Sequence, residues 1–309
     1  MYFNETHEAF RASVKRFVDR EINPNMEAWE AEGVPLHELF RKMGDLGFLG
    51  IRYDPRWGGQ GLDYWFETVF IEELGHVWGW GLPVAIMVQT NMATPAIDMF
   101  GSDFLKERYL KPAIAGEKVA AIAVTEPGAG SDVAALSTRA VRDGDAYVIN
   151  GSKTFITNGC QADFLTLLAR TSNDPGHHSY GLFVVPTDLH GFSVSKKLDK
   201  VGLRSSDTAE LFFDNVRVPA VNLIGNEREG FIYQMQQFQH ERFTILPITY
   251  IACRDIIDMT VTYIKQRIVF GKPLSTKQVL RHRLVEWLAE IESLRHLTYH
   301  VVRMKTAGL

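Results

Sequence analysis

Cysteine is scarce in this 309-residue sequence, which has only Cys160 and Cys253. Two cysteines cannot form a disulfide framework, so we expect small buried thiols in a protein from a reducing compartment. No uninterrupted apolar run reaches membrane-spanning length, and residues 1–17 show amphipathic helical spacing where a signal peptide would have an apolar core. These absences predict a cytoplasmic protein with no integral membrane association, with a processed mitochondrial matrix protein as the alternative.

Several common catalytic motifs are also missing. The sequence contains neither GxGxxG nor GxxxxGK[ST], which leaves a nicotinamide Rossmann site and a P-loop nucleotidase without support. GxSxG and cysteine-hydrolase signatures are absent as well. The single ExxH motif, Glu73 to His76, falls short of the two motifs that a di-iron bundle requires, so no metal site is expected.

Charge is unevenly distributed along the chain. The formal net charge is -4, which argues against general nucleic-acid binding. Residues 263–309 contain nine Lys and Arg against three Asp and Glu, which leaves about -10 for residues 1–262. This basic segment is either a solvated helix face or a surface that meets anionic groups.

The chain has enough apolar residues, 46%, for two or three structural units. Up to residue 118 the apolar residues follow helical spacing, as in 36–43, and from 119 to 230 short β-branched runs alternate with turn signals. Asn150-Gly151 is typical of a tight hairpin. Helical spacing returns over 231–269 and 278–304, where Pro247 should kink or break the first helix. The order predicts an α+β fold with an antiparallel middle unit.

Two segments of the middle unit stand out. Thr125–Asp132 is a glycine-rich loop after an apolar strand, which suits close backbone approach to a phosphate or a polarised ring, although an ordinary turn uses the same residues. Lys153–Gly159 offers an aromatic face beside a hydroxyl, which suits stacking on a flat heterocycle. A buried strand Phe followed by an Asn-Gly turn is the alternative.

Four ordered motifs together resemble the acyl-CoA dehydrogenase family of flavoproteins across essentially the whole chain. They are VTEPGAGSD at 124–132, KTFITNG at 153–159, KLDKVGLRSSDTAELFFDNVRVP at 197–219 followed by NLIGNEREGF, and RIVFGKPL at 267–274 with Gln278. The resemblance implies an N-terminal all-α domain (1–118), a middle antiparallel β-barrel-like domain (119–230) and a C-terminal helical bundle (231–309). It also implies FAD, an acyl-CoA substrate, a homodimer or homotetramer, and electron-transfer flavoprotein as acceptor.

The resemblance also assigns site residues. Those beside the flavin and the thioester would be Ile122, Val124, Thr125, Gly130 and Ser131, with Phe155, Ile156 and Thr157 on the other side of the ring. Family members more often have Trp at position 155. Arg267, Phe270 and Gln278 would reach the FAD of a neighbouring subunit, and a permanent guanidinium suits its pyrophosphate. This assignment favours a functional interpretation of the basic segment.

Dehydrogenation beside a thioester needs a base for the α proton while the β hydrogen leaves as hydride to flavin N5. A Glu in a dry pocket suits that task. Gln239-His240-Glu241-Arg242-Phe243 resembles the Glu-Arg motif of isovaleryl-CoA, long-chain and citronellyl-CoA dehydrogenases. Glu241 would be the base and Arg242 would position substrate, unless the two form a surface pair. Residues 90–104 also look closest to the citronellyl-CoA type, which points to branched or medium to long acyl chains.

Two other functions compete with this hypothesis. An acyl-CoA oxidase-like flavoenzyme would pass its electrons to oxygen. A truncated, non-catalytic homologue would keep only a binding or assembly role, because the family's last bundle helices would fall beyond Leu309. From the resemblance we therefore expect an incomplete third domain with reduced stability or weak cofactor retention.

Overall fold

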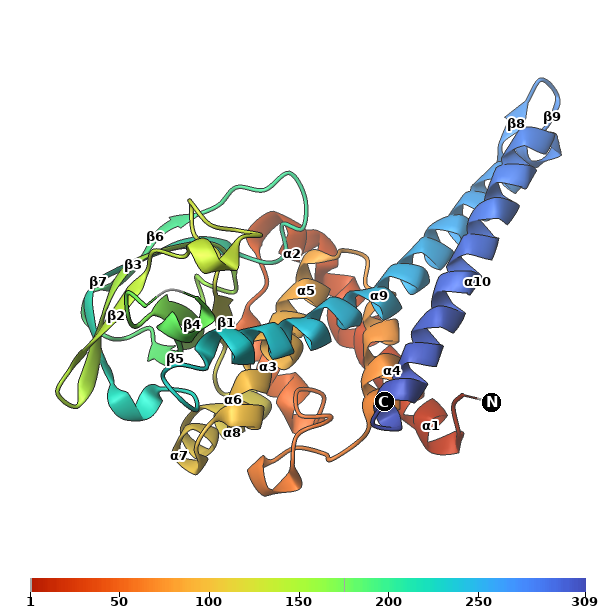
Figure 1. The fold of residues 1–309 in the computed structure, drawn as a ribbon. Helices are drawn as coiled ribbons and strands as arrows, with labels where there is room; N and C mark the ends of the chain where they lie inside the picture. The colour runs from red at the N-terminus through yellow and green to blue at the C-terminus, as the bar shows by residue number, and fades with distance from the viewer. Residues whose placement is uncertain (1, 175) are drawn as a thin grey trace. The chain divides into compact units, whose positions relative to one another are not determined.

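The computed structural model describes residues 2–174 and 176–309. Its helices and strands are α1 (Glu5–Phe17), α2 (Met26–Glu32), α3 (Leu36–Asp45), α4 (Tyr64–Leu74), α5 (Gly81–Met87), α6 (Pro95–Phe100), α7 (Asp103–Leu105), α8 (Lys111–Ile114), β1 (Ala120–Ala123), β2 (Arg139–Asp143), β3 (Ala146–Thr157), β4 (Phe164–Arg170), β5 (Tyr180–Pro186), β6 (Phe192–Lys197), β7 (Thr208–Pro219), α9 (Gly230–Gln266), β8 (Ile268–Val269), β9 (Lys272–Pro273) and α10 (Gln278–Thr306) (Figure 1). The π-helical segment η4 (Val88–Ala93) continues α5.

Contacts divide the chain into two compact units. The sheet unit comprises Asn25–Leu62 and Gly79–Glu241. The helix unit comprises the residues up to Pro24, Asp63–Trp78 and Arg242–Leu309. The helix–strand–helix order and the α+β class expected from the sequence are both present.

The sheet unit is built on a seven-stranded sheet in the order β1-β4-β2-β3-β7-β6, with β5 paired to β4. Most pairs are antiparallel, as predicted, but β4 pairs in parallel with both β1 and β2. Strand β4 is buried on both faces, because Phe164 and Leu168 belong to one apolar cluster and Leu165 and Leu167 to another. Strands that are buried on both faces have nearly continuous apolar sequences, and the sequence of β4 has this character.

Buried side-chain hydrogen bonds attach the α5–η4 segment to this sheet. Gln89 accepts from the Ala120 amide at 2.7 Å, and the Thr166 hydroxyl donates to the Ala93 carbonyl at 2.6 Å. Asn158 Nδ2 donates to the Ala85 carbonyl at 2.9 Å. A buried polar group that loses its partner is costly, so these bonds hold one face of the segment at a set position on the sheet.

One local expectation from the sequence is wrong, and one of the two alternatives in a second is excluded. Asn150-Gly151 forms no hairpin turn but lies inside β3, where Gly151 has φ +150° and the pairing with β7 shifts register. A β-bulge uses the same residue types as a tight turn, so the local signal could not separate them. Pro247 lies inside the continuous helix α9 and does not break it. Proline costs about 3 kcal/mol in a helix interior, which packing along a 37-residue helix can offset.

The helix unit contains α1, α4, α10 and α9 from Arg242 onward, with α9 and α10 joined through the β8–β9 hairpin (Figure 1). Helix α9 ends at Gln266, three residues before its expected end, because 268–269 pair with 272–273. An apolar cluster of Ile257, Ile264 and Leu284 packs α9 against α10. None of the helices formed by the described residues is long and apolar enough to cross a membrane.

The carboxylate of Glu72 joins four helices of this unit. It is 1% exposed, and it accepts hydrogen bonds from Tyr250 at 2.5 Å and Tyr299 at 2.6 Å. Arg11 of α1 contacts its other oxygen at 2.7 Å. Burial, together with the adjacent carboxylate, raises the pKa of both tyrosines, so they remain hydroxyl donors. Three donors on one buried carboxylate satisfy a charge that would otherwise be costly.

Tyr250→Phe and Tyr299→Phe should each lower the free energy of unfolding by about 1.5–3 kcal/mol, the range for hydrogen bonds to charged groups. Urea unfolding measures the loss. Tyr263→Phe is the control, because this α9 tyrosine is 58% exposed and should change stability by less than about 0.5 kcal/mol. Equal small effects at all three positions would contradict the role given to Glu72.

Candidate active site

A cavity of about 230 Å³ lies within the sheet unit. It brings together seven of the residues that the sequence predicts for the site, and these seven come from three separate stretches of chain. The lining residues are Val84, Val88, Met92, Ile122, Val124, Thr125, Phe155, Ile156, Thr157, Phe238 and Glu241. Apolar side chains dominate, with two threonine hydroxyls and one carboxylate among them. Such a composition is typical of small-molecule sites.

The first wall is β1 and the glycine-rich loop that follows it. Ile122, Val124 and Thr125 line the cavity, and the loop turns back through reciprocal backbone bonds between Glu126 and Ala129 of 2.9 and 3.1 Å. A Cβ built on Gly128 or Gly130 would meet no atom within 4 Å. The loop therefore leaves open space in front of its backbone, which a ligand could approach closely.

The second wall is the end of β3. Phe155 has φ +60° and lies at a register shift in the β3–β7 pairing. The residue is 68% exposed although it is a strand phenylalanine. A left-handed conformation costs a non-glycine residue about 1–2 kcal/mol, and such strain concentrates at functional sites. The bulge turns the aromatic ring outward beside Thr157, which suits contact with a flat heterocycle.

Beneath both walls lies a buried ion pair between Lys153 and Glu126. Lys153 Nζ is 2.9 Å from Glu126 Oε1, and both side chains are buried. Burial lowers the pKa of Lys153 to about 8, although Glu126 opposes this shift. Burial alone would raise the pKa of Glu126, but Lys153 and hydrogen bonds from Ser137 and Thr138 hold it at about 2. The pair is charged at neutral pH.

Helices supply the remaining wall. Val84, Val88 and Met92 repeat every four residues on α5–η4, and Phe238 and Glu241 lie three residues apart on α9. Glu241 is half-buried. The neighbouring His240 is fixed to Arg52 and Asn91, each 3.1 Å from its Nε2.

Sequence reasoning missed Val84, Val88, Met92 and Phe238. Their four-residue and three-residue spacing marks a helix face, but a buried core face has the same pattern.

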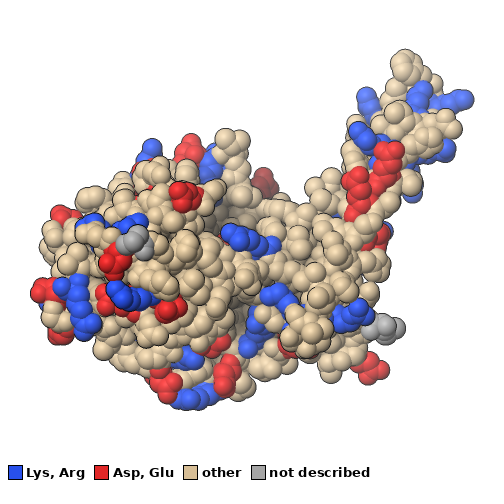
Figure 2. All heavy atoms as spheres, in the orientation of Figure 1, with Lys and Arg blue, Asp and Glu red and all other residues tan. Residues whose placement is uncertain are grey.

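The other expected residues do not line this cavity. Gly130 and Ser131 are exposed further along the loop. Arg242, Arg267, Phe270 and Gln278 belong to the helix unit, where all four are exposed. Phe270 is 92% exposed at a turn with φ +51°. Lys and Arg side chains gather at this end of the α9–α10 hairpin (Figure 2); they are Lys265, Arg267, Lys272, Lys277, Arg281 and Arg283.

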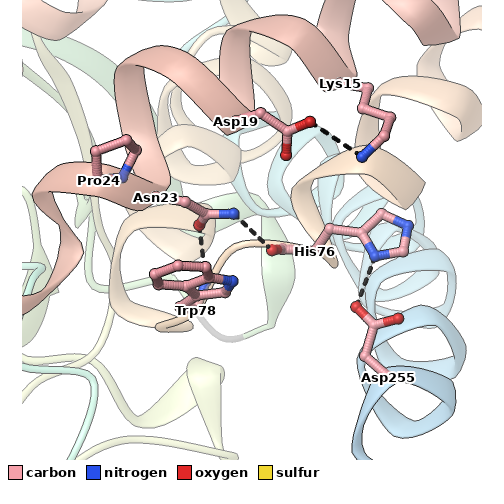
Figure 3. Close-up of a pocket in the computed structure, with 7 residues that line it drawn as sticks. All are labelled: Lys15, Asp19, Asn23, Pro24, His76, Trp78 and Asp255. Carbon is pink, nitrogen blue, oxygen red and sulfur yellow. Dashed lines mark hydrogen bonds and ion pairs between the residues drawn. The ribbon is translucent and has the colours of Figure 1, made fainter. Parts of the chain in front are cut away.

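A second cavity, of about 270 Å³, lies in the helix unit and contains none of the expected site residues. Its polar side chains pair with one another: His76 with Asp255 at 2.6 Å and Lys15 with Asp19 at 3.1 Å (Figure 3). His76 and Glu73 of the ExxH motif thus have separate partners, since Glu73 contacts Arg11 at 2.9 Å. No group of three His, Cys, Asp or Glu residues that could hold a metal occurs within 2–174 and 176–309.

Three family profiles match the chain in order. "Acyl-CoA dehydrogenase, N-terminal domain" matches residues 4–117, the middle domain of the same family matches 121–216, and its C-terminal domain matches 228–309. The chain belongs to the acyl-CoA dehydrogenase family. This membership confirms the fold class that the motifs implied, with an N-terminal helical domain, a middle curled sheet and a C-terminal helical domain.

Individual relatives agree with the family. A long-chain specific mitochondrial acyl-CoA dehydrogenase of Sus scrofa is 37% identical over 92% of this chain and 66% of its own length, so the chain spans just under two thirds of that relative. The crystal structure of an acyl-CoA dehydrogenase from Geobacillus kaustophilus is 41% identical with a TM-score of 0.95, covering 99% of this chain and 81% of that one.

The residues of the cavity fit the family's cofactor. Acyl-CoA dehydrogenases are FAD-dependent oxidoreductases, and a glutaryl-CoA dehydrogenase from Mycobacterium smegmatis was solved in complex with FADH2. That structure is 32% identical, with a TM-score of 0.91, over 99% of this chain and 78% of its own. The open glycine loop, the outward Phe155 ring and the hydroxyls of Thr125 and Thr157 suit a planar heterocycle with hydrogen-bonding edges.

Phe155→Gly should leave the free energy of unfolding unchanged within about 1 kcal/mol or raise it, because relief of φ strain offsets the flexibility of glycine. The same change should weaken FAD binding, measured by fluorescence titration. Phe212→Gly is the matched control, since Phe212 is an exposed strand residue without positive φ, and it should lose stability but keep FAD affinity. A large stability loss at Phe155 would mean that its ring is packed.

Proposed function

We propose that the protein is an FAD-dependent acyl-CoA dehydrogenase that converts an acyl-CoA thioester to the trans-2-enoyl-CoA. The observation that carries this proposal is the convergence of Glu241, Thr125, Phe155 and Thr157 on one cavity. FAD, when bound, would accept the two electrons of the oxidation as the β hydrogen leaves. Ile122, Val124, Thr125 and Phe155–Thr157 would hold its ring.

Glu241 is the proposed base that takes the α proton. Its carboxylate shares the cavity with Val84, Val88 and Phe238, and apolar surroundings that exclude water favour proton transfer to a positioned carboxylate. His240, one residue earlier, is tied to Arg52 and Asn91. These bonds oppose rotation of α9 about its axis at this level, which supports a set direction for the Glu241 side chain.

The remaining assignments are extensions of this proposal. Arg242, and Ser131 of the loop, would contact the substrate. Arg267, Phe270 and Gln278 would contact the FAD of a neighbouring subunit in a homodimer or homotetramer, and the exposed basic end of the hairpin supports contact with an anionic group. Electron-transfer flavoprotein would be the acceptor, and the cytoplasm the location.

The cavity also bears on the acyl chain. The sequence motifs favour branched or medium to long chains, and the helical wall of the cavity includes Val84 and Val88. Val84 and Val88 are β-branched and have few rotamers on a helix, so these side chains cannot easily move aside to make room for a longer acyl chain. We therefore propose a compact, branched acyl chain over a long straight one.

Glu241→Gln should keep FAD yet slow flavin reduction by acyl-CoA about 10²–10⁴-fold, because the amide cannot accept the α proton. Anaerobic stopped-flow bleaching of the flavin band measures this rate. Glu290→Gln, an exposed change on α10, is the control and should reduce at the normal rate. Near-normal reduction of the Glu241 variant would remove that residue from the mechanism. Peroxide formation without any other acceptor would favour the oxidase-like alternative.

Val88→Ala should raise kcat/KM for long straight acyl-CoA relative to kcat/KM for short branched acyl-CoA by about tenfold or more. The smaller side chain leaves space for additional methylene groups, and an effect of this size is expected for such a change. A panel of acyl-CoA substrates of graded length and branching measures the ratio. Val141→Ala, on an exposed part of β2, is the control. An unchanged ratio, or a wild-type preference for long straight chains, would contradict the proposed chain class.

A further inference from the structure

Lys153 makes three hydrogen bonds from a fully buried ammonium group. Nζ donates to the Val124 carbonyl at 2.9 Å, to the Leu168 carbonyl at 2.8 Å and to Glu126 Oε1 at 2.9 Å. An ammonium has three donors and no acceptor, so every one of them is used. The side chain thus joins β3 to β4 and to the glycine-rich loop after β1.

Glu126 extends this network to the start of β2. Its Oε2 accepts from the Ser137 amide at 2.7 Å and the Ser137 hydroxyl at 2.6 Å. Its Oε1 accepts from the Thr138 amide at 2.9 Å as well as from Lys153. Each carboxylate oxygen therefore has two donors, and the base of the loop is attached to three strands.

Neither Lys153 nor Glu126 lines the cavity, but residues one or two positions away from each of them do. Val124 and Thr125 form one wall, and Phe155, two residues after Lys153, forms the other. The Thr154 amide also donates to the Thr125 carbonyl at 2.9 Å. Buried ion pairs contribute little net stability and are often replaceable by apolar residues. The placement of this pair between two walls of a binding cavity therefore suggests a role beyond folding.

The geometry of the Val124–Thr125 peptide indicates that role. In a trans peptide the C=O and N–H groups point in opposite directions. Because the Val124 carbonyl points at Lys153, the Thr125 N–H points away from Lys153, and Thr125 is a residue that lines the cavity. A charged donor on the carbonyl also polarises the peptide and makes its N–H a stronger donor.

We propose that Lys153, held by Glu126, is a positioning residue that directs and strengthens the Thr125 N–H as a donor to the acceptor edge of the flavin ring. This inference rests on the proposed function, because it requires FAD in the cavity. Lys153 itself touches neither flavin nor substrate. It acts through the peptide that it holds and through the spacing that it sets between the loop and β3.

Three variants of the full chain separate positioning from folding. Lys153→Met removes the ammonium and leaves Glu126 buried without its counter-charge. Adding Glu126→Gln to Lys153→Met also removes that orphaned charge, so the double variant should recover much of the lost stability. Phe183→Leu is the control for stability loss, because Phe183 is buried in the apolar cluster formed by the sheet and lies outside the cavity lining.

The first measurement needs no cofactor. Amide hydrogen exchange over 124–131, followed by mass spectrometry, should speed up in Lys153→Met and in the double variant but not in Phe183→Leu. Equal exchange rates over 124–131 in the wild type and all three variants would show that Lys153 does not fix the conformation of the loop. This result stands whether or not the wild type binds FAD, so it separates a failure of the inference from a failure of the proposed function.

The second measurement is FAD titration with the visible spectrum of the bound flavin. Lys153→Met and the double variant should both bind FAD at least about tenfold more weakly, the loss expected for one charge-assisted hydrogen bond, with a shifted flavin band. Phe183→Leu should keep wild-type affinity and spectrum. Wild-type affinity and spectrum in the double variant would show that the pair only stabilises the fold and would overturn the inference. Absence of FAD binding by the wild type would overturn the proposed function.

Discussion

The buried ammonium of Lys153 is the constraint on which the site depends. A charge in the protein interior must have all its donors satisfied, and Lys153 meets this requirement with acceptors on the β1 loop, on β4 and on Glu126. The glycine-rich loop therefore cannot move away from β3 without exposing an unpaired charge. A loop with several small residues, which would otherwise be flexible, keeps one conformation beside the cavity.

The same strand carries the strain of the site. Two residues after Lys153, the backbone of Phe155 takes φ +60° and the pairing with β7 slips. The hydrogen bonds of the sheet on both sides of Phe155 prevent its backbone from relaxing, so the sheet holds this residue in an unfavourable conformation. The gain is an exposed aromatic ring next to Ile156 and Thr157, and it explains why an apolar aromatic residue stays at the surface of a well-packed sheet.

Much of the fold could be predicted from local patterns, because burial follows periodicity. Leu36, Leu39, Phe40 and Met43 mark α3, and all four are buried. The parallel pairing of β1 with β4 and the bulge at Gly151 depend on partners distant in sequence, which local residue types do not specify. Seven cavity residues were found through motifs, whereas the Val84–Val88–Met92 face was missed because it looks like any core face. The strain at Phe155 has no signal in the sequence at all.

We propose that the cavity of the sheet unit takes a flavin and a thioester side by side. The most direct test is a visible spectrum of the purified chain after incubation with FAD and desalting, followed by anaerobic addition of a branched acyl-CoA. We expect a retained flavin band that bleaches on addition of the thioester. Protein that stays colourless after FAD, or a band that the thioester leaves unchanged, would contradict it.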